Sequence, residues 1–143
     1  MEKMMIDEEM KKQAIECLSY ANGYFSTLES GLEKEIRFNN DLRYNLAVMC
    51  VEKYFVSLLS CYNTNASHHM PIALFKEAQH YEDQLTESIK QTCIYVGKFE
   101  AICSLDDFGY KTPTDDDISI MIAGMREIKN LVDKRVQELI EAD

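Results

Sequence analysis

The segment from Asn40 to Tyr62 is apolar over most of the circumference that it would have as a helix. Two sets of apolar residues recur side by side at helical spacing, and only a narrow polar strip separates them. A helix with this pattern is buried on most sides. We therefore expect a central helix of a bundle, or a helix that also lies in a subunit interface. The two sets are Tyr44, Val48, Val51, Phe55, Leu58 and Tyr62, and Leu42, Leu46, Met49, Val56 and Leu59.

Three further segments carry one apolar stripe each at helical spacing. They run from Asp7 to Ser30, from Glu82 to Ser104, and from Thr112 or Thr114 to Glu141. A short helix from Pro71 to Ala78 is also expected, because proline suits the first helical position. Only five glycines and two prolines interrupt the chain, which favours long helices. The sequence predicts an all-α fold, an up-and-down four-helix bundle or five helices with the short one, in a single domain over residues 1–143.

Two local features refine this prediction. Thr114 followed by Asp117 resembles a capping box, so the acidic run 115–117 is interpreted as a helix start. With Asp106 and Asp107, this run lacks the pattern of an EF-hand calcium loop. Gly97 and Gly124 fall inside the last two long helices, where glycine costs about 1 kcal/mol relative to alanine. A close approach of these two helices would explain both glycines.

The net charge of −10 disfavours several classes of function. An acidic surface opposes tight, direct binding to nucleic acid and to anionic lipid. The five cysteines show no Cys-x-x-Cys spacing and lie in apolar patterns, so we interpret them as reduced core residues. No stretch has the length of a signal peptide or of a membrane span. The expected location is the cytoplasm.

Residues that could carry chemistry are few and do not form a recognised motif. His68, His69 and His80 have no acidic or cysteine partner at metal-ligand spacing. Glu52 and Lys53 lie in the most apolar segment, where we expect an ion pair on the polar strip. Phosphate-binding, nucleophile-elbow and zinc-protease motifs are missing. No catalytic residue, metal or cofactor is therefore predicted. Tyr20, Tyr24, Tyr44, Tyr54 and Tyr62 are interpreted as core residues, with an inter-helix pocket as the alternative.

Three passages between Arg43 and Leu131 resemble the HEPN family of small helical domains. The stretch RYNLAVMCVEKYFVSLLSCY, Arg43 to Tyr62, is similar to the family's second helix. The stretch HHMPIALFKEA, His68 to Ala78, is similar to the segment that follows. The turn DDFGY, Asp106 to Tyr110, resembles the family's Asp-Tyr turn.

The resemblance implies a helical bundle that commonly forms a homodimer. It also implies a protein partner such as a nucleotidyltransferase in a toxin–antitoxin pair, although other members are RNases or nucleotide-binding modules. The RNase members use an arginine followed four to six residues later by histidine. None of the four arginines here has such a histidine, and Cys103 stands where a second type of motif has arginine. The chain is therefore expected not to be an enzyme.

We expect a non-catalytic, HEPN-like interaction domain that self-associates and partners another protein. The alternative is a module that binds a nucleotide or small ligand between helices, with tyrosine rings on the base and arginines on phosphate. Its candidate ligand-binding residues are Arg43, Tyr44, Arg126 and His69. A second alternative is a degenerate RNase that uses His68 or His69.

Overall fold

A computed structural model of the chain describes residues 6–33, 40–103 and 112–142. These residues form five helices and no strand, which confirms the all-α prediction. No helix in this described part is long and apolar enough to cross a membrane. The helices are α1 (Glu8–Glu33), α2 (Asn40–Cys61), α3 (Pro71–Ala78), α4 (Glu87–Cys103) and α5 (Asp115–Glu141).

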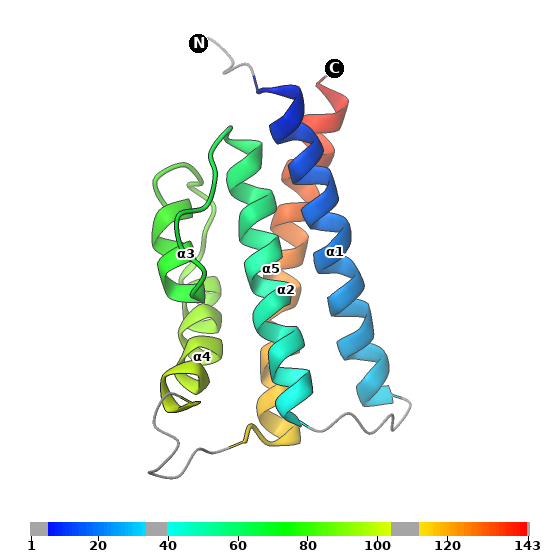
Figure 1. The fold of residues 1–143 in the computed structure, drawn as a ribbon, viewed down its shortest axis with the longest axis vertical. Coiled ribbons are helices and arrows are strands. Elements are labelled where there is room, and N and C mark those ends of the chain that lie inside the picture. Colours follow the sequence, from blue (N-terminus) through cyan, green and yellow to red (C-terminus); the bar gives the residue numbers. More distant parts are fainter. Residues whose placement is uncertain (1–5, 34–39, 104–111, 143) are drawn as a thin grey trace.

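The long helices lie side by side in an up-and-down bundle (Figure 1). α1, α2 and α5 form one side of it, and α3 and α4 follow one another along the other side of α2. α2 packs against all four other helices. The central-helix interpretation is therefore confirmed, and burial inside one chain accounts for most of its apolar circumference. Tyr44, Val51 and Phe55 are fully buried, whereas Leu42 and Met49 remain 44% and 41% exposed.

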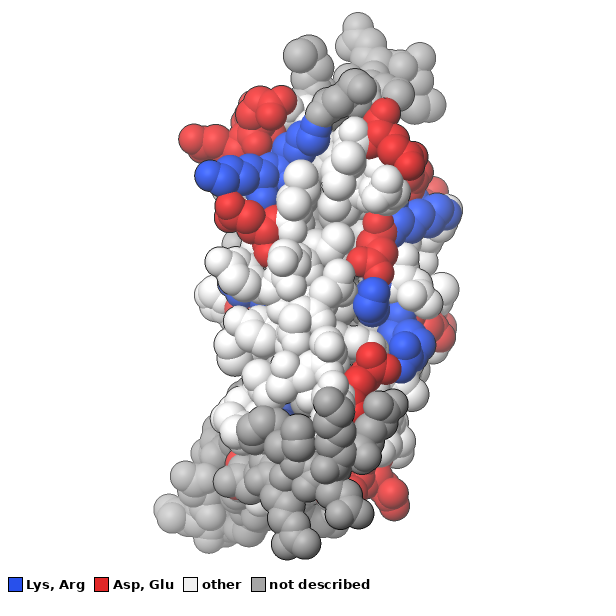
Figure 2. Space-filling view, turned by 90° about the vertical axis from the view of Figure 1, so that its right-hand side faces the viewer, with Lys and Arg blue, Asp and Glu red and all other residues white. Residues whose placement is uncertain are grey.

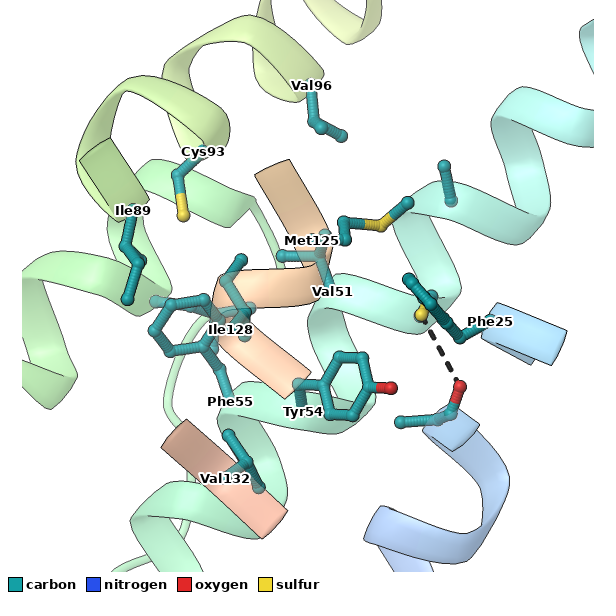
Figure 3. Close-up of a cluster of buried hydrophobic side chains, with 14 of the residues drawn as sticks. Phe25, Val51, Tyr54, Phe55, Ile89, Cys93, Val96, Met125, Ile128 and Val132 are labelled. Carbon is teal, nitrogen blue, oxygen red and sulfur yellow. Dashed lines mark hydrogen bonds between the residues drawn. The ribbon is translucent and has the colours of Figure 1, made fainter. Parts of the chain in front are cut away.

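Side chains from four helices meet in the core (Figure 3). Phe25 comes from α1, Phe55 from α2, Cys93 from α4 and Met125 from α5, and each is at most 1% exposed. Several polar groups that enter this core form hydrogen bonds there, as buried groups generally do. The Cys50 thiol, for example, donates to the carbonyl oxygen of Ala21 over 3.4 Å.

The helix ends differ from the predicted ones where local bonds intervene. α1 continues past Ser30 to Glu33. α2 ends at Cys61, where Asn63 takes the left-handed conformation with φ 60° that commonly closes a helix. α4 begins at Glu87 and not at Glu82, because Glu82 belongs to the preceding turn and accepts a bond from the amide of Gln84.

The predicted capping box at the start of α5 is confirmed. The amide of Asp117 donates to Thr114 Oγ1 over 3.1 Å, and the amide of Thr114 donates to Asp117 Oδ2 over 2.9 Å. Asp106 and Asp107, like the rest of residues 104–111, lie outside the described residues.

Only one of the two internal glycines marks a close approach. A Cβ atom built on Gly124 would lie 2.8 Å from Thr92 Cγ2 of α4, so this glycine is where α4 and α5 come together. A Cβ atom on Gly97 would meet nothing within 4 Å. The packing explanation is confirmed for Gly124 and wrong for Gly97.

Candidate interaction surface

The four candidate ligand-binding residues do not come together in the structure. Arg43 is buried, and its Nη1 donates to Asn40 Oδ1 over 3.2 Å and to Asp115 Oδ1 over 3.4 Å. Its Nη2 donates to the carbonyl oxygen of Gly31 over 3.3 Å. Tyr44 is also buried, and its hydroxyl donates to the carbonyl oxygen of Val96 over 2.7 Å. Both side chains therefore hold helices together.

Arg126 and His69 lie elsewhere on the surface. Arg126 pairs with Glu29 of α1 and stands over the Phe25 ring, 5.2 Å from its centre. Asp115 is the partner of Arg43. Arg126 lies eleven residues after Asp115 in α5, which corresponds to about 16 Å along the helix. One phosphate group cannot meet both arginines. His69 is 88% exposed and lies 3.0 Å from Glu52 Oε2. Glu52 therefore pairs with His69. The sequence predicts an ion pair on the polar strip of α2, where Glu52 and Lys53 lie.

The five tyrosines considered as a pocket lining are also dispersed. Tyr44 and Tyr54 are buried, and the Tyr54 hydroxyl donates to Asn22 Oδ1 over 2.7 Å. Tyr62 stacks on Tyr81 with 6.0 Å between ring centres. Tyr20, in contrast, is 58% exposed. No shared inter-helix pocket follows from these positions.

A buried carboxylate was missed by the sequence analysis. Glu82 is 1% exposed, and Arg135 of α5 binds both of its oxygens, with Nε at 2.6 Å and Nη2 at 2.8 Å. The Tyr62 hydroxyl donates to Oε1 over 2.8 Å, and the Gln84 amide donates to Oε2. Both oxygens are thus used within the fold. The cluster ties the turn before α4 to the ends of α2 and α5 and leaves no free group for a ligand.

An uncharged surface was also missed, although the sequence contains its signal. Twelve residues of α1, from Cys17 to Leu28, include no Asp, Glu, Lys or Arg. Their outward members lie beside exposed, uncharged residues of α2. Figure 2 shows the result as an area without charged side chains that runs along this face of the molecule. We name this surface the uncharged strip; its exposed members are Ser19, Tyr20, Gly23, Ser26 and Thr27 of α1 and Leu42, Asn45 and Met49 of α2.

Charged residues at one end of the uncharged strip and along its α5 side occur in pairs of opposite sign. Lys12 Nζ and Glu16 Oε1 lie 3.9 Å apart at one end. Along the α5 side, Lys129 Nζ and Asp133 Oδ2 lie 2.6 Å apart, and Arg126 pairs with Glu29. The strip is therefore uncharged, and these two borders of it carry no net charge, in a chain with a net charge of −10.

The outward side of α1 carries small residues at the centre of the uncharged strip. Gly23 lies at the middle of the uncharged strip, and a Cβ atom there would meet nothing within 4 Å. Ser19 and Ser26 lie one turn to either side of it, so a facing surface can come near the helix backbone. Tyr20, Leu42 and Met49 are exposed next to these small residues and offer apolar contact area.

Nothing in the described part of the chain resembles a metal or nucleophile site. No group of three His, Cys, Asp or Glu side chains among these residues is arranged to hold a metal ion. Cys50, Cys61 and Cys93 carry free thiols, and burial raises the pKa of each to about 12. Such thiols are poor nucleophiles at neutral pH.

Comparisons with protein-family models, with curated proteins and with solved structures found no match to this chain. The resemblance to the HEPN family therefore stays a prediction.

Proposed function

We propose that this chain is a non-catalytic helical interaction domain that self-associates, with a second copy of the chain seated on the uncharged strip. The observation that carries the proposal is the strip itself: a near-neutral face with exposed Tyr20, Leu42 and Met49 on a strongly acidic chain. Contiguous exposed apolar area with a polar rim is typical of protein contact sites.

Charge favours a second copy as the occupant. Two chains of net charge −10 repel each other wherever acidic surfaces meet. That repulsion is smallest where both faces lack net charge, as the uncharged strip does, and the charges along its α5 side are paired with one another. A basic partner would instead be drawn to the acidic faces elsewhere on the molecule.

The uncharged strip is large enough to form the centre of a dimer interface. Its α1 part, Cys17 to Leu28, has 12 residues and is therefore about 18 Å long. Two packed helices are about 18 Å wide, so the strip covers roughly 320 Å². A standard interface takes about 800 Å² from each partner, so the charged residues beside the strip would form the polar rim of the contact.

Matched glycine substitutions test this proposal. Gly23→Glu places a charge at the centre of the strip, and Gly97→Glu makes the same change on α4, away from it. Both positions have room for a side chain, and both variants have the same net charge. We expect a dimer for the unsubstituted chain and for Gly97→Glu by analytical ultracentrifugation. Gly23→Glu should weaken dimerisation about 100-fold, since an unpaired charge would be buried.

Two results would contradict self-association through this face. A strictly monomeric chain at high micromolar concentration would refute self-association itself. An equal dimerisation constant for the two variants, with unchanged helix content by circular dichroism, would place the contact elsewhere. The HEPN resemblance adds a second proposal, a cytoplasmic protein partner of the nucleotidyltransferase class, which co-purification with such a protein tests separately.

A further inference from the structure

A surface cavity of about 390 Å³ lies between the loop 62–70 and α3. Its volume falls at the lower end of the range for small-molecule sites. Two of the three histidines of the chain line it, together with a lysine. The full lining is Ser67, His68, Ala73, Lys76, Glu77 and His80.

Glu77 fixes the orientation of the His68 ring. His68 Nδ1 lies 3.1 Å from Glu77 Oε1, and the Ser67 amide donates to both Glu77 oxygens, over 2.9 and 3.1 Å. Partial burial acts to raise the pKa of Glu77, but the bonds from His68 and Ser67 outweigh it, and the pKa lies below its ordinary value. The carboxylate is therefore ionised and its oxygens are occupied. Because Nδ1 is engaged, the other ring nitrogen, Nε2, is the one left for a ligand.

The cavity is a local departure from the acidic surface of the chain. Lys76 is exposed and positively charged, and a protonated imidazole donates from both of its nitrogens, so His68 and His80 can add donors beside it. Glu77 is the one carboxylate in the lining, and its oxygens are occupied by His68 and the Ser67 amide. Two other acidic groups meet this loop: Glu52 of α2 lies against His69, and Glu82 is bound by Tyr62 and Arg135. An anion in the cavity would thus meet the Lys76 ammonium group and two imidazole rings, while the charge of Glu77 is directed at His68 and the Ser67 amide.

We propose that this cavity binds the phosphate group of a small phosphorylated molecule, held by Lys76, His68 Nε2 and His80. Charge-assisted bonds from such donors are the strong kind, and lysine with imidazolium is suited to a phosphate dianion. None of the six lining residues is Phe, Tyr or Trp, so a nucleobase would find no ring to stack on. The volume and the polar lining fit a sugar phosphate or a similar phosphomonoester.

Titrating the full chain with glucose 6-phosphate, with glucose and with inorganic phosphate distinguishes the ligand sources. We expect glucose 6-phosphate to bind and glucose not to bind. Amide chemical-shift changes in NMR spectra should concentrate at residues 67–80.

Two pairs of variants, each with the same substitution inside and outside the cavity, test where the ligand binds. Lys76→Gln should weaken binding of glucose 6-phosphate at least tenfold, whereas Lys134→Gln, an exposed lysine of α5, should leave it unchanged. His80→Gln should weaken it, and His69→Gln, next to the cavity but not in its lining, should not. Equal affinities for Lys76→Gln and Lys134→Gln would overturn the proposal, as would shift changes spread over the surface. Inorganic phosphate that binds as tightly as the ester would identify the free ion as the ligand and overturn the phosphomonoester assignment.

Discussion

Thr92 of α4 occupies the space beside Gly124 of α5 so closely that no side chain fits on the glycine. A Cβ atom there would lie 2.8 Å from Thr92 Cγ2 and 3.0 Å from Thr92 Cβ. Thr92 is held in place, because its hydroxyl donates to the carbonyl oxygen of Ser88 over 3.1 Å. The pair therefore sets the distance between the two helices.

We expect Gly124→Ala to destabilise the fold by about 1–3 kcal/mol, because the added methyl group forces α4 and α5 apart. The substitution raises helix propensity by about 1 kcal/mol, which offsets part of that cost. Urea denaturation measures the difference. Gly23→Ala is the matched control and should stabilise, since its Cβ atom meets nothing within 4 Å. Adding Thr92→Ala to Gly124→Ala should restore much of the loss; a double variant no more stable than Gly124→Ala would contradict the contact.

The two internal glycines also show how far sequence reasoning reaches. Periodicity places Gly97 and Gly124 inside helices but does not determine which neighbour faces each of them. That depends on the rotation and spacing of α4 against α5, which only the packed structure provides. For the same reason the apolar stripes predicted the bundle and the central position of α2, but not the 44% exposure of Leu42.

We expect Glu82→Gln to cost about 3 kcal/mol of unfolding free energy at pH 7, because it leaves Arg135 without its buried counter-charge. Glu138→Gln is the control. Glu138 also binds Arg135, over 2.8 Å, but its side chain is 56% exposed, and an exposed pair contributes at most about 1 kcal/mol. Similar losses of unfolding free energy in the two variants, measured by urea denaturation, would show that burial does not make the Glu82–Arg135 pair more important than the exposed pair.

The acid dependence of stability provides a separate test of the same cluster. Burial acts to raise the pKa of Glu82, but bonds from Arg135, Tyr62 and the Gln84 amide outweigh it, and its pKa is lowered. A glutamate in the unfolded chain titrates near 4.3, so on acidification the unfolded state binds the proton first. The contribution of Glu82 is therefore complete above about pH 4.3 and is lost as the pH falls through its folded pKa. The stability difference between the unsubstituted chain and Glu82→Gln should narrow from pH 7 to pH 3; a constant difference would contradict the lowered pKa.

The Glu82 cluster and the uncharged strip were missed for different reasons. Glu82 fits the start of the α4 helical pattern, and its partner Arg135 is 53 residues away, so no local rule links them. The charge-free run of α1 was visible in the sequence, but its meaning depends on which residues face outward. Ser19, Gly23 and Ser26 face solvent only because Ala14, Ala21 and Phe25 occupy the core.

We expect Thr114→Ala to cost about 1 kcal/mol, the usual effect of removing an N-cap side chain. Thr112→Ala is the matched control, because sequence reasoning left the helix start open between these two threonines. Only Thr114 accepts the bond from the Asp117 amide. The midpoint of urea denaturation should fall for Thr114→Ala and stay unchanged for Thr112→Ala. A lower midpoint for Thr112→Ala alone would show that Thr112, and not Thr114, caps α5.

Four of the five cysteines should be unreactive in the folded chain. Burial raises the pKa of Cys50, Cys61 and Cys93 to about 12 and also raises that of Cys17. Because the thiolate is the reacting form, a pKa near 12 lowers its population at pH 8 by roughly a thousandfold relative to a free thiol of pKa 8.5. In a Cys103→Ser background, a chromogenic disulfide reagent should therefore react with these four thiols only as fast as the fold opens. Concentrated guanidinium chloride should make all four thiols react at once. Rapid reaction of Cys50, Cys61 or Cys93 under native conditions would contradict the raised pKa and show that this thiol is open to solvent.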